Sequence, residues 1–328
     1  MGSGIKMRSA VDAAGNTFSL DKLQGNHDAG IPQPMLFCSD NVCNVPVRFV
    51  HRHQQNRKNL TEPVDVPAYI GLTSGSSHME GCRFDASSRI TAIVASSDSN
   101  FVVQLAAGKH ELRLLLLHNG LSNKPISGAN PTIPLPVAGA KSVTTQYVSS
   151  GQKLDSYLRT TADLLELREL CDSDADLAKR LTLRFGSKQI RWSEFFFEKD
   201  GFADAWQALK GSKGKLHPIA LVGEVKSINP PPPGSVYTST YLNCKPAYNK
   251  TGEVNKVDVF EVSVQHKDQK WLAAFPIGSL VLMFGLWEYK DAVERTSKGK
   301  DPTKPSVTYV THKLILRPNF MQQLRAAF

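Results

Sequence analysis

Residues 275–287 read Phe275-Pro276-Ile277-Gly278-Ser279-Leu280-Val281-Leu282-Met283-Phe284-Gly285-Leu286-Trp287. A turn-forming Pro-Ile-Gly-Ser segment leads into an apolar run of strand-forming residues that Gly285 interrupts. Another strand-like run, Ile219 to Ile228, is interrupted in the same way by Gly223. Because glycine inside a strand marks a tight bend, such as the corner of a barrel, these two runs indicate strands of a small, strongly curved sheet.

The sequence around this run contains further strands and one short helix. Residues 270–275, Lys270-Trp271-Leu272-Ala273-Ala274-Phe275, suit a single helical turn whose Trp271 and Phe275 we expect in the core. The strand-like runs are Ile219 to Ile228, Val236 to Lys245, Val257 to Val264, Ser279 to Lys290 and Thr308 to Leu316. Five strands with a short helix between the third and the fourth predict an OB-fold barrel over residues 211–328.

The same residues resemble a known family. Residues 275–287 resemble the Lys-Gly-Ser-x-Val-x-Val-x-Gly-x-Leu run of bacterial single-stranded-DNA-binding proteins, and Ile219 to Val225 resembles their opening strand. The resemblance covers about residues 216–320 and departs at Ile277, usually lysine in the family, and in the loop Pro230 to Pro233. It implies the fold more strongly than the ligand, because OB-folds also bind oligosaccharides and proteins.

The second strand indicates the kind of ligand. Alternation places Tyr237, Ser239, Tyr241, Asn243 and Lys245 on one face, and the more apolar Thr238, Thr240, Leu242 and Cys244 on the other. The first face offers rings that stack on bases and cations that meet phosphates, although the tyrosines could simply cover the barrel's edge. We predict a surface that binds single-stranded nucleic acid, formed by Lys226, Tyr237, Tyr241, Asn243, Lys245, Trp287, Tyr289, Lys290, Lys313 and Arg317.

The charge of the chain is unevenly distributed. The formal net charge is +9, but residues 1–209 hold 22 Lys and Arg against 21 Asp and Glu, whereas residues 210–328 hold 17 against 9. A basic excess concentrated in the last third favours a polyanionic partner and binding that weakens with salt. A lysine-rich surface that only aids solubility is the alternative.

Four residues near the N-terminus have the composition of a metal site. Cys38 and Cys43 form a Cys-x4-Cys pair, and His78 and Cys82 form a His-x3-Cys pair after a 34-residue gap. Three thiolates and an imidazole fill the tetrahedron that Zn²⁺ prefers and leave no position for water, which predicts a structural zinc site. His51 and His53 are rivals of His78, and we expect at most one of the two to bind the same metal. Five cysteines, an odd number, make a disulfide framework the weaker interpretation.

The remaining segments complete an α+β, multidomain prediction. We expect an irregular lead-in over 1–33, a zinc-binding module with a β meander over 34–120, a linker over 121–145 and a helical and hairpin segment over 146–210. The meander would use Arg89 to Ala95, Phe101 to Ala106 and Glu111 to His118. The leading Met-Gly-Ser-Gly resembles a vector-derived tag.

In the central segment, apolar spacing predicts a helix over 154–170, and Ser173 and Asp176 suggest a capping box. The buried stripe of a short helix is expected at Phe202, Ala205, Trp206 and Leu209.

The function expected from these features is non-enzymatic. No P-loop, dinucleotide-binding glycine motif, HExxH or GxSxG is present, and no apolar run is long enough to span a membrane. We expect a cytoplasmic accessory factor of DNA replication, recombination, mobile-element transfer or defence, with a protein partner as well. The rivals are an adaptor that docks a partner on the OB-fold and a metal-dependent nuclease. For the latter, residues 37–82 loosely resemble the finger of CoiA-type competence proteins, but a convincing nuclease signature is missing.

Overall fold

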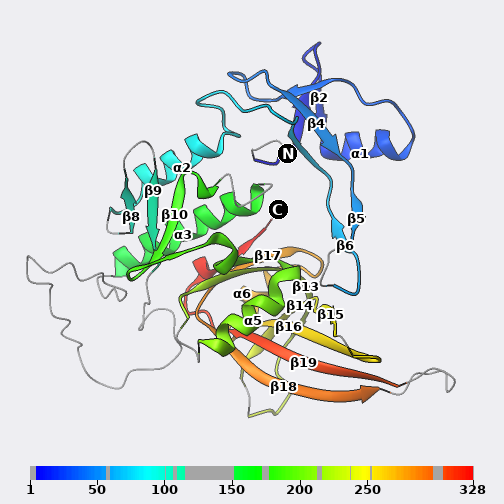
Figure 1. Cartoon of the computed structure of the whole chain (residues 1–328), viewed down its shortest axis with the longest axis vertical. Coiled ribbons are helices and arrows are strands. Elements are labelled where there is room, and N and C mark those ends of the chain that lie inside the picture. The colour runs from blue at the N-terminus through cyan, green and yellow to red at the C-terminus, as the bar shows by residue number, and fades with distance from the viewer. Residues whose placement is uncertain are drawn as a thin grey trace, which may run out of the picture. The chain divides into compact units, whose positions relative to one another are not determined.

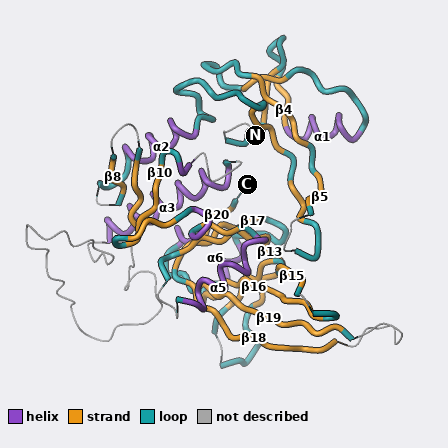
Figure 2. Tube along the Cα trace, viewed as in Figure 1, coloured by secondary structure: helices purple, strands orange, loops and turns teal. Residues whose placement is uncertain are grey.

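The chain is a β-rich mixture of strands and a few helices (Figures 1 and 2). The computed structural model describes residues 5–56, 60–99, 101–105, 109–114, 151–171, 177–212, 216–236, 238–251, 253–297 and 306–327. The predicted linker over 121–145 and the capping box at Ser173 lie outside this range. No helix in these ranges is long and apolar enough to cross a membrane.

The chain divides into two compact units, each discontinuous in sequence. Unit 1 comprises Met1–Arg57, Pro63–Leu112 and Asp163–Thr182, and unit 2 comprises Lys58–Glu62, Arg113–Ala162 and Leu183–Phe328. The short segment Lys58–Glu62 therefore belongs to unit 2, although it comes early in the sequence.

An antiparallel sheet in the order β2-β1-β3-β4-β7 forms the centre of unit 1. Its buried core contains Met7, Leu23, Leu36 and Ile70, together with the cysteines discussed below. The strands are β1 (Ser9–Val11), β2 (Thr17–Ser19), β3 (Leu36–Cys38), β4 (Pro46–Val50) and β7 (Tyr69–Leu72), and β5 (His53–Gln55) and β6 (Val64–Val66) form a separate pair.

The prediction of an irregular lead-in over residues 1–33 is wrong. This segment contains β1, β2 and helix α1 (Leu20–Asp28). The Asp12 carboxylate accepts hydrogen bonds from the backbone N–H groups of Ala14 and Asn16, which fixes the turn between the two strands. The Ser19 hydroxyl accepts from the Lys22 N–H and caps the helix. The polar residues that suggested irregular structure are turn and cap residues between elements too short to show a period.

The strand expected over Arg89 to Ala95 is also wrong, because these residues lie in helix α2 (Ala86–Ala95). The Asp85 carboxylate caps this helix by accepting from the Ser88 N–H at 2.8 Å. Ile90, Ile93 and Val94 fall at the i, i+3 and i+4 spacing of a helix, and Ile90 is fully buried. Their β-branched side chains favour strands, but the cap and the spacing prevail.

The central segment contains a long helix, a hairpin and a short amphipathic helix, as expected. Helix α3 spans Gly151–Leu170, and Gly186, with a φ of 61°, turns the chain between β10 (Leu181–Phe185) and β11 (Lys188–Ile190). In α5 (Phe202–Gly211), Phe202, Ala205, Trp206 and Leu209 are all buried, which confirms their assignment to the core. The other elements here are β8 (Val102–Gln104), β9 (His110–Arg113), η2 (Trp192–Glu194), β12 (Phe196–Phe197) and η3 (Lys199–Gly201), and the four longer strands form a sheet in the order β11-β10-β9-β8.

Unit 2 is built on a nine-stranded sheet. Its main path runs β18-β19-β16-β14-β13-β17-β20, with β12 beside β13 and β15 beside β16. The elements are β13 (Ile219–Asn229), β14 (Thr240–Cys244), β15 (Ala247–Lys250), β16 (Lys256–His266), α6 (Gln269–Ala273), β17 (Leu280–Gly285), β18 (Trp287–Ser297), β19 (Val307–Leu316), η4 (Met321–Gln323) and β20 (Leu324–Ala326). The first, third and fifth predicted strands and the short helix are present, the second is a strand over Thr240–Cys244, and the fourth is divided in two.

A closed five-stranded barrel, in contrast, is not confirmed. In the hydrogen-bonded order, β17 and β18 lie toward opposite ends of the sheet, and no ladder joins them. The sequence run predicted as one fourth strand is divided at Gly285 and Leu286 into these two strands, of which β17 pairs with β13 and β18 pairs with β19.

The two glycines that interrupt the strands occupy crowded positions. A Cβ atom on Gly223 would lie 2.8 Å from the Cys244 Sγ, and one on Gly285 would lie 2.8 Å from the Leu316 Cδ1 and 2.7 Å from the Gln323 Nε2. Gly223 therefore allows β13 to approach β14 closely, and Gly285 allows the chain to bend between β17 and β18. Trp271, in α6, and Phe275, just after it, are buried, as predicted.

Candidate functional site

Cys38, Cys43, His78 and Cys82 converge in unit 1, and their ligand atoms all lie within 4.8 Å of one another. Cys38 ends β3, Cys43 follows a turn closed by its N–H and the Asp40 carbonyl, and Cys82 follows a turn from Met79. The four side chains lie close enough to hold a metal ion.

Three of the six distances between these atoms match the edges of a tetrahedron around one ion. The Cys38 and Cys82 sulfurs are 3.8 Å apart, and the His78 Nδ1 lies 3.4 Å from the Cys43 Sγ and 3.5 Å from the Cys82 Sγ. Tetrahedral zinc bonded to sulfur and nitrogen gives an edge of about 3.8 Å between two sulfurs and about 3.6 Å between sulfur and nitrogen. The donor set is thus spaced for coordination through Nδ1.

The electrostatics of the cluster favour a bound cation. Burial raises the pKa of the Cys38 and Cys82 thiols and lowers that of the His78 imidazole. Burial alone would also raise the pKa of Cys43, but hydrogen bonds from the Met79 and Val45 backbone N–H groups and from the Cys82 and Cys38 side chains together lower it. Buried thiols without a cation remain protonated, whereas a dication stabilises the thiolates, and the neutral imidazole is already the metal-binding form.

The rival histidines are not part of this cluster. The His51 and His27 rings stack with centroids 4.2 Å apart, and the His53 Nδ1 lies 2.9 Å from the His51 carbonyl oxygen. Both rivals are exposed. Among the described residues, His78 is the histidine placed beside the three cysteines.

The second candidate surface is one face of the unit 2 sheet, which we call the outer face. The strand register pairs Tyr241 with Gln265, Tyr248 with Val259, and Val257 with Tyr309, so these residues share this face. The same register pairs Lys290 with Lys313. The opposite face carries the buried Leu242, Val264 and Leu314.

The predicted alternation along the second strand is confirmed over residues 240–245. Thr240, Leu242 and Cys244 are buried, whereas Tyr241 is 36% exposed and Lys245 is exposed. Asn243 lies between them, but its amide is engaged by the Ser227 and Ser263 hydroxyls. Tyr237 lies outside the described residues.

Trp287 and Tyr289 do not belong to the outer face, which corrects their assignment to the nucleic-acid surface. The Trp287 indole is 6% exposed and its N–H donates to the Ile219 carbonyl at 3.2 Å. The half-buried Tyr289 ring packs edge-on against Trp206, with centroids 6.1 Å apart. Alternation after Gly285 turns both side chains to the core, where large rings fill the space under α5.

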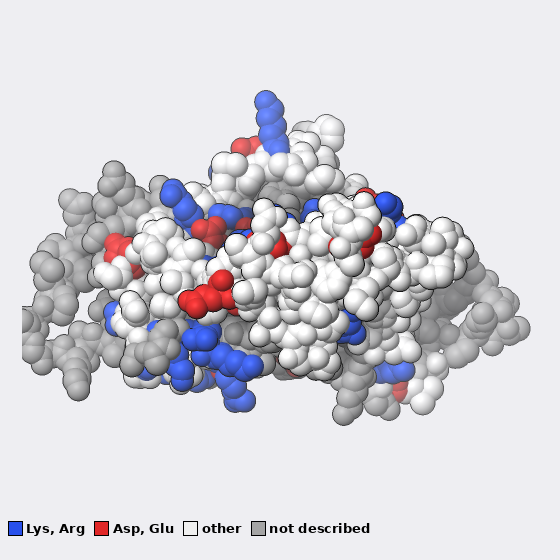
Figure 3. Space-filling model, turned by 90° about the horizontal axis from the view of Figure 1, so that it is seen from above, with Lys and Arg blue, Asp and Glu red and all other residues white. Residues whose placement is uncertain are grey.

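The basic residues predicted for this surface differ in how far their charge is neutralised. Lys245 pairs with Glu224 at 2.6 Å, Lys313 pairs with Glu261 at 3.0 Å, and Arg317 pairs with Glu288. On the described parts of β13, β15 and β18, Lys226, Lys250, Lys290 and Arg295 have no ion pair. Figure 3, a view of the molecule from above, shows Lys and Arg in several groups with Asp and Glu near them.

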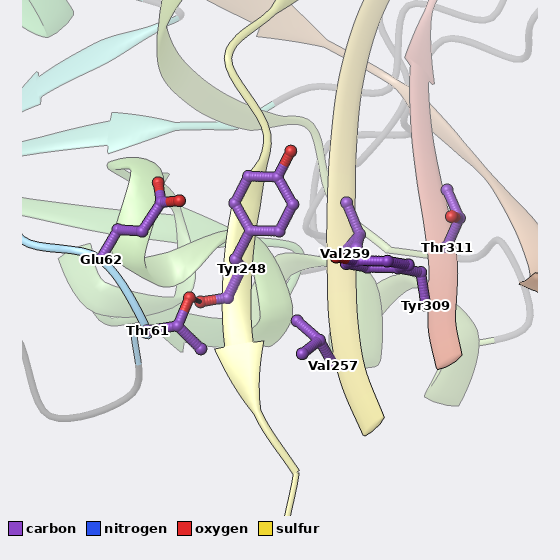
Figure 4. Close-up of a pocket in the computed structure, with 7 residues that line it drawn as sticks. All are labelled: Thr61, Glu62, Tyr248, Val257, Val259, Tyr309 and Thr311. Carbon is purple, nitrogen blue, oxygen red and sulfur yellow. Dashed lines mark hydrogen bonds between the residues drawn. The ribbon is translucent and has the colours of Figure 1, made fainter. Parts of the chain in front are cut away.

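The outer face also contains a pocket that the sequence analysis missed. It has a volume of about 480 Å³ and is lined by Thr61, Glu62, Tyr248, Val257, Val259, Tyr309 and Thr311 (Figure 4). Alternation in the last predicted strand, applied as in the second, would have placed Tyr309 on the outer face. No local signal indicates that Thr61 and Glu62 join it.

Comparison with known proteins gives no family for this chain. No protein-family model matches the sequence, and no curated protein does.

Proposed function

We propose that the protein binds single-stranded nucleic acid on the outer face of the unit 2 sheet and that a zinc ion stabilises unit 1. The observation that carries this proposal is a set of three tyrosines on the strands that flank β16, Tyr241 on β14, Tyr248 on β15 and Tyr309 on β19, with cations on the same sheet. Rings on one face of a sheet offer bases stacking platforms, and lysine and arginine contact the phosphates between them.

The topology of the sheet supports an OB-type fold for this domain. The β16 and β19 strands are parallel, β13 pairs antiparallel with both β14 and β17, and α6 lies between β16 and β17 in sequence. With the bend at Gly285, we take the consecutive strands β17 and β18 together as the fourth strand of an OB-type fold: β17 pairs with β13 and β18 pairs with β19. OB-folds bind oligonucleotides on the face that carries their second and third strands, here β14 and β16.

The number of unpaired cations determines how strongly binding should depend on salt concentration. Ion pairs reduce the charge of Lys245, Lys313 and Arg317, so phosphate contacts fall mainly to Lys226, Lys250, Lys290 and Arg295. Each phosphate contact to a single strand contributes about 0.7 to the slope of log affinity against log salt. Four contacts predict a slope of roughly −3, which is moderate salt dependence.

Zinc is the proposed ion because the donor set is three sulfurs and one nitrogen with tetrahedral spacing. A site with four protein ligands has no open position for a substrate, so the metal would stabilise the fold of unit 1 rather than take part in a reaction.

The proposal is tested by fluorescence anisotropy with a labelled ten-residue thymidine strand over a series of salt concentrations. Tyr241→Ala should weaken binding about five- to 150-fold, the equivalent of one stacked base, because its ring is on the surface. The matched control, Lys179→Ala, changes an exposed residue of unit 1 and should bind as the wild type does. Equal affinity of wild type and Tyr241→Ala, or no binding at low salt, contradicts the proposal.

Trp287→Ala separates binding from folding in the same experiment. Because Trp287 is buried and bonded to Ile219, its truncation should destabilise unit 2 by about 3–5 kcal/mol. Tyr241→Ala should leave the unfolding midpoint nearly unchanged. A Trp287→Ala variant as stable as the wild type would show that its ring is not part of the core.

A further inference from the structure

The pocket on the outer face is built from three strands and an early segment of the chain. The Thr61 N–H and hydroxyl both donate to the Tyr248 carbonyl oxygen, at 2.7 and 2.9 Å, and Leu60 forms a β-bridge with Asn249. These contacts fix the position of Glu62, the next residue, at the pocket. The segment therefore adds an acidic side chain to a surface that is otherwise formed by residues after 216.

The shape and lining of the pocket suit a flat, partly apolar group. Figure 4 shows the Tyr248 ring face-on and the Tyr309 ring edge-on, so the two planes are steeply inclined, with Val257 and Val259 beside them. A planar ligand stacked on Tyr248 would direct one edge toward Tyr309 and Thr311 and another toward Glu62. A volume of about 480 Å³ is enough for one nucleobase with part of its sugar.

The charges around the pocket favour a neutral base inside it and phosphates on its flanks. Burial raises the pKa of the Tyr248 phenol, and the nearby Glu62, Tyr309 and Glu261 raise it further, so the ring stays neutral and the immediate surroundings repel anions. The register places Lys250 opposite Val257 and Arg295 opposite Tyr309, on the flanks. A nucleotide would thus insert its base and leave its phosphates to these two cations.

The Glu62 carboxylate restricts which base fits. An ionised carboxylate only accepts hydrogen bonds. Guanine alone among the common bases presents two adjacent donors, N1–H and the N2 amino group, on its Watson–Crick edge. Adenine and cytosine pair one amino donor with an acceptor nitrogen, and thymine and uracil flank one N–H with two carbonyl oxygens, so each would place an acceptor against the carboxylate.

We propose that the pocket is a subsite for a single guanine base, stacked on Tyr248 and selected by Glu62. This inference rests on the proposed binding of single strands to the outer face. It adds a base preference to a surface whose remaining contacts are indifferent to sequence.

The test uses the full, metal-loaded chain and labelled ten-residue thymidine strands with one central residue changed to guanine, inosine, adenine or cytosine. The guanine strand should bind about tenfold tighter than the all-thymidine strand, as for a carboxylate or guanidinium that pairs twice with a base. Inosine lacks the N2 amino group and should lose most of this gain. Adenine and cytosine should show none.

Variants of Glu62 and Tyr248 test whether these residues cause the preference for guanine. Glu62→Gln should abolish the guanine preference and keep the affinity for the all-thymidine strand, whereas Glu253→Gln, an exposed glutamate outside the pocket, should change neither. Tyr248→Phe should retain the preference and Tyr248→Ala should lose it.

The outcomes distinguish the two proposals. Equal affinity for all five strands, or a guanine preference that survives Glu62→Gln, overturns the guanine subsite while binding to single strands stands. Failure of every strand to bind, the all-thymidine strand included, overturns both.

Discussion

Replacing Cys38 with serine should release the metal and unfold unit 1 while unit 2 stays folded. Cys38, Cys43 and Cys82 are three of the ten buried residues in the hydrophobic core cluster around the β2-β1-β3-β4-β7 sheet of unit 1. A structural zinc site contributes about 10–16 kcal/mol of apparent binding free energy, most of which is folding free energy. Because a domain of this kind is stable by only about 5–15 kcal/mol, losing the ion should exceed the stability of unit 1.

The distribution of cysteine and tryptophan allows both units to be followed in one sample. Among the chain's five cysteines, all buried, only Cys244 lies in unit 2. All four tryptophans, Trp192, Trp206, Trp271 and Trp287, lie in unit 2. In Cys38→Ser, a chromogenic thiol reagent should therefore react with the cysteines of unit 1 under native conditions. The tryptophan emission and its urea midpoint should not change, and Cys244 should remain protected.

A matched control tests whether the effect comes from metal ligation. Cys171→Ala removes a buried cysteine of unit 1 that is not part of the cluster, so this variant should retain one metal ion per chain, measured by release to a chelating dye. Treating the wild type with a strong chelator should reproduce the Cys38→Ser pattern. A Cys38→Ser protein that keeps stoichiometric metal and protected thiols would refute the assignment of Cys38 as a ligand.

Two further predictions concern unit 2, and both use tryptophan emission during urea unfolding. Gly285→Ala should destabilise unit 2 by about 1–3 kcal/mol, because its Cβ would lie 2.8 Å from the Leu316 Cδ1. The control is Gly211→Ala, whose Cβ would have no atom within 4 Å. Equal urea midpoints for the two variants would contradict the crowding at Gly285. His217 is 6% exposed and burial lowers its pKa, so the unfolded chain takes up the proton first as the pH decreases. Well above pH 6.5, the ordinary pKa of histidine, His217 should not affect the free energy of unfolding of unit 2. As the pH falls from 6.5 toward the lowered pKa of His217, this free energy should decrease. His217→Gln should show a shallower loss between pH 7 and 5, and parallel curves would exclude the effect.

The fold could be predicted where a local pattern coincides with burial. The period-two alternation in Thr240 to Cys244 and the helical spacing of Phe202, Ala205 and Trp206 each reflect one buried face, so both were identified correctly. The strand predicted over Arg89 to Ala95 is wrong because β-branched residues favour strands only weakly, and the Asp85 cap and the i, i+3, i+4 spacing decide for a helix. The elements before residue 33 were missed because three-residue strands are too short to establish a period.

The metal cluster could also be predicted, because its chemistry is carried by residue type. Cysteine and histidine pairs at turn spacing have few other roles, so the four residues were found before their distances were known. The surface proposed to bind nucleic acid was only partly predictable. Tyr248 and Tyr309 lie on it and Trp287 and Tyr289 do not, because the register of β18 places Trp287 opposite Leu316 and Tyr289 opposite Leu314, on the buried face.

The sequence by itself determined the donor set near the N-terminus, the basic excess after residue 210, and the order of strands and helix in the last third of the chain. These properties depend on side-chain chemistry and on periods of two or 3.6 residues, which are local. Only the tertiary structure decided that Glu62 reaches Tyr248 and that the cations of Lys245, Lys313 and Arg317 are paired with carboxylates. Both follow from contacts between residues distant in sequence, which are set by strand register and chain path and leave no local pattern.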